Sequence, residues 1–364
     1  MAESAIEWLW PKGFKGMAWN PITGCTKTSP GCANCYAETM SIRFQGVQGY
    51  GGNYLAGQPG QAAILFHEDR LQQPFHWKNP RCVFVNSVSD LFHEDVPFEW
   101  VEKILAVIAL NPQHLFLALT KRPERMLEYF TMDRGISDVQ SEVMAMAEAK
   151  FGIVWDARGS NPANYRPRPW NPESLARRRA FPGWPLPNLW LGTSVENQHF
   201  ADIRLPILRR VPAAVRWASV EPMLGAIDFS KHFERFDSQG RNVTGIPRMW
   251  DEDDTTSIDW AVFGGESGPG ARPMHPGWLY QGIQVADAAG IPVFFKQWGN
   301  WRPRTLGDKG TVRMVKFKRG TPNPGELASA RMVNVGKKKA GAKLIPDGYN
   351  PTTRKQYPKG LVSA

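Results

Sequence analysis

Residues 82–126 read CVFVNSVSDLFHEDVPFEWVEKILAVIALNPQHLFLALTKRPERM, and this stretch decides the fold. Short apolar runs at 83–85 and 115–119 each end in polar residues. Between them, apolar side chains recur at helical spacing after Pro97, a residue suited to the first turn of a helix. A strand, a helix and a second strand in this order predict a parallel β/α unit.

The same alternation extends over most of the chain. Toward the N-terminus, Met17 to Trp19 predict a first strand, which leads into a cysteine-containing loop and a helix from Tyr36 to about Phe44. Toward the C-terminus, strands are predicted in the segments NLWLGTS, VRWASV, DWAVFGG and PVFFKQ, with helices through Ile203 to Arg210 and Trp278 to Ala289, the latter closed by Gly290. We therefore expect an α/β fold built as a complete or partial (β/α) barrel of the TIM type.

The barrel is predicted to be interrupted once and extended once. Residues 1–301 carry the β/α pattern, but 131–187 break it with many Pro, Trp and Arg residues and are interpreted as an insertion. Residues 302–364 form a C-terminal extension in which only a strand pair around 311–317 is indicated. No internal repeat is found.

The positive charge of the chain belongs to this extension. The 364 residues contain 44 Lys and Arg against 34 Asp and Glu, and residues 302–364 alone hold 15 against 3, a net of +12. The remainder therefore has 44 − 15 = 29 basic and 34 − 3 = 31 acidic residues, a net of −2. A localised basic segment suits nucleic acid or another polyanion, or is a solvated extension, and both interpretations stay open.

Three of the four cysteines lie within eleven residues of one another. In WNPITGCTKTSPGCANCYAE (19–38), Cys25, Cys32 and Cys35 have the spacing C-x6-C-x2-C. Thiolates are the ligands that iron–sulfur clusters and zinc favour, and a set of three leaves one position open for a ligand. The fourth cysteine, Cys82, is expected to be a buried apolar side chain at the start of the second strand. No apolar run approaches the roughly 20 residues of a membrane span, and the N-terminus lacks the pattern of a signal sequence, so we predict a cytoplasmic protein.

Polar side chains follow six predicted strands, and four of these strand ends carry an acid. In β/α barrels, functional residues come from the C-terminal ends of the strands. Polar residues also follow strands in any soluble protein. Their recurrence at six strand ends, four of them with an acid, nevertheless favours a functional site at the C-terminal edge of the sheet. The acidic run DEDD at 251–254 is interpreted as solvated.

A three-cysteine loop after the first strand of such a barrel resembles the radical S-adenosylmethionine enzymes. This resemblance implies that three thiolates hold three irons of a 4Fe-4S cluster, that the fourth iron binds S-adenosylmethionine, and that a 5′-deoxyadenosyl radical abstracts hydrogen from a substrate. The commonest spacing of that superfamily is C-x3-C-x2-C, from which this loop departs in its first gap.

A narrower resemblance covers nearly the whole chain. The segments DLFHEDVP, LTKRPERM, LGTSVENQ, SVEPMLG, GGESGPGARPMHPGW and FFKQWG, together with the cysteine loop, resemble a phage-associated family of three-cysteine-motif proteins without an assigned reaction, related to spore photoproduct lyase. The superfamily's arrangement implies cofactor contacts from Asn86, Ser87, Asp90, Ser194, Glu196 and Glu221. Lys121, Arg122, Arg272, His275 and Lys296 are the candidates for substrate binding.

The sequence thus predicts a radical S-adenosylmethionine enzyme that modifies or repairs a nucleic acid or nucleotide, with an electron donor such as flavodoxin or ferredoxin. Two other readings remain. A zinc-stabilised nucleic-acid-binding protein would need a fourth ligand, and the earliest histidine is His67. A metal-independent barrel hydrolase would use strand-end acids such as Glu196 and Glu221.

Overall fold

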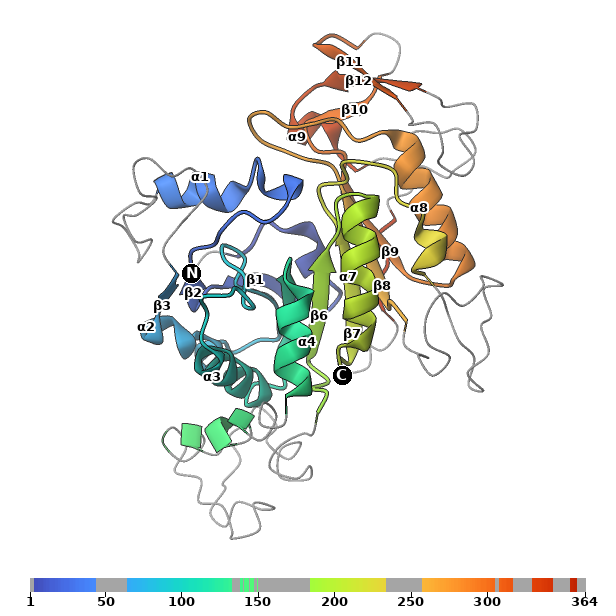
Figure 1. Ribbon diagram of the computed structural model, residues 1–364. Helices are drawn as coiled ribbons and strands as arrows, with labels where there is room; N and C mark the ends of the chain where they lie inside the picture. The colour runs from blue at the N-terminus through green and yellow to red at the C-terminus, as the bar shows by residue number, and fades with distance from the viewer. Residues whose placement is uncertain are drawn as a thin grey trace. The chain divides into compact units, whose positions relative to one another are not determined.

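The computed structural model describes residues 3–43, 64–132, 184–233, 257–304, 308–316, 329–342 and 354–358, with short pieces between 138 and 149. Its main sheet has seven strands in the order β1-β4-β5-β6-β7-β8-β9 (Figure 1). These strands are β1 (Lys15–Trp19), β4 (Arg81–Val85), β5 (Leu115–Thr120), β6 (Leu189–Ser194), β7 (Val215–Val220), β8 (Trp260–Gly264) and β9 (Val293–Gln297). The pairings β1–β4, β4–β5, β7–β8 and β8–β9 are parallel.

Helices alternate with the strands of this sheet. They are α1 (Tyr36–Arg43), α2 (Glu68–Leu71), α3 (Phe98–Ala109), α4 (Pro123–Thr131), α7 (Gln198–Arg210) and α8 (Pro276–Ala288). Short 3-10 turns are η1 (Glu7–Leu9), η2 (Pro30–Cys32), η3 (Gln73–His76) and η4 (Phe229–Lys231). The predicted β/α alternation is confirmed. Because β1 and β9 stand at opposite ends of the strand order and do not pair among the described residues, the topology is that of a partial rather than a complete barrel.

The chain divides into two compact units. The N-terminal unit comprises Met1–Thr26, Met40–Leu191 and Val211–Ala214, and the C-terminal unit comprises Lys27–Thr39, Gly192–Arg210 and Val215–Ala364. Cys25 thus belongs to the first unit, whereas Cys32 and Cys35 belong to the second. The domain limits expected from the sequence stay a prediction, and most of the expected insertion at 131–187 lies outside the described residues.

Aromatic and branched side chains form the core of the N-terminal unit. Strands β4 and β5 are apolar on both faces, as expected for strands covered by helices. Trp19 is fully buried, packs edge-on against Phe116 with 5.8 Å between ring centroids, and donates from Nε1 to the backbone oxygen of Arg70 at 2.8 Å. In α3 the positions Val101, Ile104, Leu105 and Ile108 recur at helical spacing and are completely buried. Each such side chain contributes about 1.5–3 kcal/mol on burial.

Tryptophan dominates the core of the C-terminal unit. Trp217 of β7 and Trp260 of β8 are fully buried with ring centroids 5.6 Å apart. A Cβ on Gly192 would lie 2.5 Å from the Trp217 ring, so the glycine in β6 is what allows this ring to pack. These contacts pack β6, β7 and β8 against one another within the unit.

Two smaller antiparallel sheets complete the described structure. One joins β2 (Ile22–Thr23) to β3 (Leu65–Phe66), and the other has the order β10-β12-β11, formed by β10 (Trp301–Pro303), β11 (Val312–Lys316) and β12 (Ser329–Asn334). Of the strand pair expected around 311–317, β11 lies in that range, and its partner β12 lies at Ser329–Asn334. A four-residue helix, α9 (Lys337–Ala340), follows β12. Among the described helices none has the length and apolar character needed to cross a membrane.

Candidate functional site

The four cysteines fall into two classes. Cys25, Cys32 and Cys35 are partly exposed thiols, and none forms a disulfide. Cys82 is only 1% exposed, as predicted, and burial raises the pKa of its thiol. The three loop cysteines are therefore accessible to a metal group, whereas Cys82 is buried as a neutral thiol. Cys32 closes the turn η2, and Cys35 immediately precedes α1.

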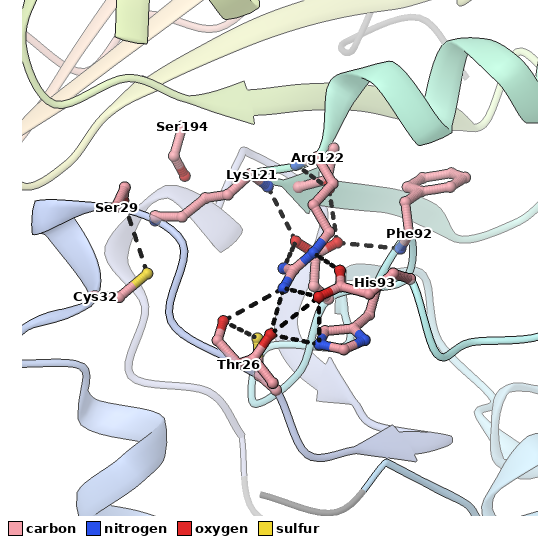
Figure 2. Close-up of polar contacts among 12 residues, drawn as sticks. Thr26, Ser29, Cys32, Phe92, His93, Lys121, Arg122 and Ser194 are labelled. Carbon is pink, nitrogen blue, oxygen red and sulfur yellow. Dashed lines mark hydrogen bonds and ion pairs between the residues drawn. The ribbon is translucent and has the colours of Figure 1, made fainter. Parts of the chain in front are cut away.

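Arg122 holds the residue that follows Cys25. The arginine stands two residues after β5, and its Nη2 donates to Thr26 Oγ1 at 2.7 Å and to the Thr26 backbone oxygen at 3.4 Å (Figure 2). The Cys25 thiol itself donates to that same oxygen at 3.5 Å. Arg122 therefore holds both the side chain and the backbone oxygen of Thr26, the residue next to the first cysteine of the motif.

Asp90 positions Arg122 and has no acceptor capacity left. Its Oδ1 accepts from Thr120 Oγ1 at 2.6 Å and from Phe92 N at 3.1 Å. Its Oδ2 accepts from Lys121 N at 3.0 Å and from Arg122 Nη1 at 3.2 Å. A carboxylate offers about four lone-pair sites, and all four are used here. The expected contact of Asp90 with a cofactor stays a prediction, and this geometry assigns the side chain to the support of Arg122.

Glu94 and His93 complete the group around Thr26. Glu94 accepts from Arg122 Nε and, at 3.3 Å, from Arg122 Nη2. Burial is the largest single influence on the pKa of Glu94 and raises it, but the hydrogen bond from Arg122, a backbone hydrogen bond and the charges of Arg122 and His93 together outweigh burial, and the pKa falls to about 2. His93 Nδ1 accepts from the backbone N of Asp95 at 3.0 Å, so the proton is on Nε2, which donates to Thr26 Oγ1 at 2.8 Å. Burial, and then the charge of Arg122, lower the pKa of His93 and keep the ring neutral.

Arg122 is a permanent cation close to Cys25. Burial alone lowers its pKa, but the hydrogen bond to Glu94 and the charges of Asp90 and Cys25 raise it on balance. The network formed by Thr26, Asp90, His93, Glu94 and Arg122 thus holds the chain beside Cys25.

Glu196 performs a comparable task for the second part of the motif. The side chain is fully buried at the end of β6, where its Oε2 lies 3.2 Å from Arg204 Nη1 and its Oε1 accepts from Ser29 Oγ at 2.6 Å. Since Ser29 gives its proton to Glu196, the Cys32 thiol is the donor in its 3.7 Å contact with Ser29 Oγ (Figure 2). A Cβ on Gly31 would lie 2.5 Å from Glu196 Oε1, so the turn η2 packs directly on this carboxylate.

Arg272 secures the same turn from a second direction. Its Nη2 donates to the Pro30 backbone oxygen at 2.9 Å, and Glu266 accepts from its Nη2 at 2.6 Å and its Nε at 2.8 Å. The hydrogen bond to Glu266 raises the pKa of Arg272, and the arginine in turn lowers the pKa of Glu266 against the opposing effect of burial. Asn34 adds a hydrogen bond from Nδ2 to the Gly270 oxygen at 3.2 Å.

Glu221 and Lys296 form a separate ion pair at the ends of β7 and β9. The Nζ and Oε1 atoms are 3.2 Å apart, and the side chains are 15% and 21% exposed, respectively. A Cβ on Gly264, at the end of β8, would lie 2.2 Å from Glu221 Oε1, so the glycine makes room for the carboxylate. This pair is more accessible than Glu196, which is fully buried.

The other predicted residues occupy varied positions. Asn86 is 2% exposed and has a φ of 54°. Its Oδ1 accepts from Ile22 N at 3.2 Å, and its Nδ2 has no hydrogen-bond partner among the described residues. Ser87 donates to Asn20 Oδ1 at 3.1 Å, and Ser194 is buried at the end of β6. His275 is a fully buried N-cap of α8 whose Nδ1 accepts from Gly277 N, and burial lowers its pKa to about 4.

Several participants were not found from the sequence: Thr26, Ser29, His93, Glu94, Arg204 and Glu266. Two of them lie inside the cysteine motif itself, and Glu266 belongs to the GGES segment to which no role was given. Within the part of the chain that the structure describes, no group of three His, Cys, Asp or Glu side chains forms a ready-made metal site. The DEDD run at 251–254 lies outside the described residues.

The sequence profile of a family described as a protein of unknown function, DUF5131, matches residues 3–353. The chain belongs to this family. No curated protein matches it. Among solved structures it is similar to a cysteine-to-serine mutant of spore photoproduct lyase, with 12% identity, a TM-score of 0.32, and coverage of 87% of this chain and 68% of that one. It is also similar to spore photoproduct lyase complexed with dinucleoside spore photoproduct, with 11% identity, a TM-score of 0.35 and the same coverage.

This likeness is remote and carries no assignment of function. The expected association of the family with phages stays a prediction.

Proposed function

We propose that the chain is a radical S-adenosylmethionine enzyme that binds a 4Fe-4S cluster through Cys25, Cys32 and Cys35 and modifies or repairs a nucleic acid or nucleotide. The observation that carries this proposal is the donor set. Three accessible thiols stand in one loop, and the residues next to them are held by buried charged groups. Such support is expected of a loop whose sulfur atoms must keep a fixed geometry around a metal group.

The residues present fit an iron–sulfur cluster better than a structural zinc ion. A structural zinc site needs four protein ligands, and the cysteine loop and the helix after it contain no histidine, the earliest being His67. Cys82 is excluded by its burial and raised pKa. When bound, the cluster would supply an electron to S-adenosylmethionine and so generate the radical that abstracts hydrogen. An electron donor such as flavodoxin or ferredoxin is part of the proposal.

The chain's own residues take two kinds of role. Arg122, Glu196 and Arg272 are positioning residues, because their partners are the backbone or side chains of the cysteine loop. Glu221 and Lys296 stay available to a ligand at the strand ends, where the carboxylate suits a cationic or hydroxyl group and the ammonium an anionic one. The amino, carboxylate and ribose groups of S-adenosylmethionine have this chemistry.

Asn86 is the third group available to the cofactor. Its Nδ2 is buried and has no partner in the part of the chain that the structure describes, which is costly unless a ligand or water accepts from it. Of the cofactor contacts expected at the strand ends, Asn86 and Glu221 thus have polar atoms available to a ligand, and those from Ser87 and Ser194 stay predictions. The nucleic-acid part of the proposal is supported by the basic segment 302–364.

Anaerobic reconstitution with iron and sulfide tests the proposal. The full chain is expected to bind a cluster with broad visible absorption and, after reduction, to release methionine and 5′-deoxyadenosine from S-adenosylmethionine. Replacing Cys25, Cys32 or Cys35 by alanine should abolish both properties. The matched control is Cys82→Ala, which removes a thiol of the other class and should retain the cluster.

Three results would contradict the proposal. If the protein contains zinc after purification and stays colourless after reconstitution with iron and sulfide, the zinc-stabilised nucleic-acid-binding protein is favoured. A hydrolytic activity that survives replacement of all three loop cysteines would favour the hydrolase. Cluster loss in Cys82→Ala with a normal fold would show that the ligand set is wrong.

A further inference from the structure

The sheet β10-β12-β11 has one face on which cations and exposed apolar side chains lie side by side. In β10 and β12, Arg302 pairs with Val333 and Pro303 with Met332, and the hydrogen bond from Arg304 N to Arg331 O at 2.9 Å continues this register. In β12 and β11, Arg331 pairs with Met314. Residues directly opposite one another in an antiparallel pair point to the same face. Arg304, Arg331 and Met314 therefore form one row across the sheet.

The arrangement of Arg304 opposite Arg331 opposes folding. Like charges directly opposite one another on neighbouring strands destabilise a sheet. Both side chains are exposed, and neither has an acidic partner among the described residues. Their repulsion is therefore unrelieved within the described chain, and an anion bound between them would remove it.

The surrounding charge is of the same sign. Between 302 and 342 the described residues contain nine cations against one acid, Asp308, which pairs with Arg302. The exposed cations without an acidic partner in this described stretch are Arg304, Lys309, Arg313, Arg331, Lys337, Lys338 and Lys339. Such a concentration of unpaired positive charge attracts a polyanion rather than a single small anion.

Apolar side chains in the same rows indicate which polyanion fits. Met314 is 53% exposed and Val312 is 39% exposed, and both stand on the outer strand β11 on the face that carries Arg331. A duplex presents phosphates and keeps its bases stacked inside, whereas a single strand exposes the apolar faces of its bases beside its phosphates. Cations next to exposed apolar side chains match the single strand.

We propose that the face of β10-β12-β11 that carries Arg304, Arg331 and Met314 binds single-stranded nucleic acid, with the two arginines on phosphates and Met314 against a base. This inference rests on the nucleic-acid part of the proposed function and adds the surface and the form of nucleic acid. It requires no cluster, so it is tested apart from the chemistry.

The test measures binding of the full chain without its cluster to a labelled oligodeoxynucleotide of mixed sequence, by fluorescence anisotropy over a range of salt concentrations. Each phosphate contact to a single strand contributes about 0.7 to the slope of log affinity against log salt. The double variant Arg304→Gln/Arg331→Gln should therefore lower the slope by about 1.4, which is two contacts. The matched control Lys12→Gln/Lys78→Gln removes two exposed cations of the other unit and should leave the slope unchanged.

A second variant tests the apolar contact. Met314→Ser should weaken binding without changing the salt slope, because no charge is removed. Thermal unfolding of Arg304→Gln/Arg331→Gln checks the fold, and its midpoint should not fall, since the substitution relieves a repulsion. Three results would overturn the proposal. The double variant could have the same salt slope as the wild type, or the control variant could lose as much slope as the double variant. The protein could also bind a duplex more tightly than its separate strands. The proposal would also be overturned if replacing the two arginines weakened binding to anionic lipid vesicles but not to the oligonucleotide.

The result is separable from the enzyme proposal. Cluster assembly in Arg304→Gln/Arg331→Gln should be unchanged, because neither arginine contacts the cysteine loop in the described structure. Failure of the binding test with normal cluster assembly would reject the surface and leave the enzyme proposal standing.

Discussion

Replacing Gly31 with alanine puts a methyl group into space that the side chain of Glu196 already fills. The added Cβ would lie 2.5 Å from Glu196 Oε1 and 2.6 Å from its Cγ, well inside van der Waals contact. Glu196 has little freedom to move away, because it is fully buried and its two oxygens are bound by Ser29 and Arg204. Overpacking of this kind costs about 1–3 kcal/mol.

The expected result is therefore a loss of about 2 kcal/mol in the free energy of unfolding, measured with urea, together with fewer irons per chain after reconstitution. The control is Gly225→Ala, whose Cβ would meet only Asn197 Cβ at 3.4 Å, an ordinary contact. It should keep its stability to within about 0.5 kcal/mol and its full iron content.

A compensating substitution sharpens the test. Glu196→Asp shortens the carboxylate by one methylene and makes room for the new methyl group, at the cost of its hydrogen bond to Ser29 or Arg204. In a double-mutant cycle, Gly31→Ala and Glu196→Asp should be coupled by at least about 1 kcal/mol, with the double variant more stable than the sum of the single effects. Additive effects, or an unchanged iron content in Gly31→Ala, would refute the role of Glu196 as the support of this turn.

Three further predictions concern single side chains. Arg122→Gln leaves the buried Asp90 without its cation and should lower the free energy of unfolding by about 3 kcal/mol in urea titrations; a change below about 1 kcal/mol would contradict the network. His114 is 1% exposed, and burial lowers its pKa to about 4 in the folded protein. Between about pH 6.5 and pH 4 the imidazole is therefore protonated in the unfolded chain but neutral in the folded one. The free energy of unfolding should therefore decrease over this window by up to about 3 kcal/mol, and His114→Gln should flatten the profile in urea titrations at each pH. Glu221→Gln, which leaves Lys296 unpaired, should weaken binding of S-adenosylmethionine to the reconstituted protein about tenfold in calorimetry, with iron content unchanged as the control.

Local sequence was enough to place the main elements, because their apolar periodicity and their boundary residues agree. The helix predicted after Pro97 is α3, which begins at Phe98. Gly290, with a φ of 65°, follows α8 as expected of a residue that ends a helix. The strands of the main sheet also end where the sequence changes from apolar to polar residues, as predicted.

The partners of the charged residues could not be predicted in the same way. Arg122 and Thr26 are 96 positions apart, and Ser29 and Glu196 are 167 apart, so nothing in the local pattern links them. Residue type indicated that Asp90, Glu196 and Arg272 have a task, but not whether they face a ligand or the chain itself. That distinction depends on burial and on the number of acceptors already used, which only the folded structure shows.

The buried position of Cys82 provides an internal standard for counting thiols. Native protein without a cluster should react with iodoacetamide at Cys25, Cys32 and Cys35, whereas Cys82 reacts only after unfolding, because its thiol is both inaccessible and protonated. The ratio of alkylated sites in native and denatured samples therefore reports how many loop cysteines are occupied by a ligand. The count needs neither a substrate nor an assay of activity, and it can follow occupancy as iron is added or removed.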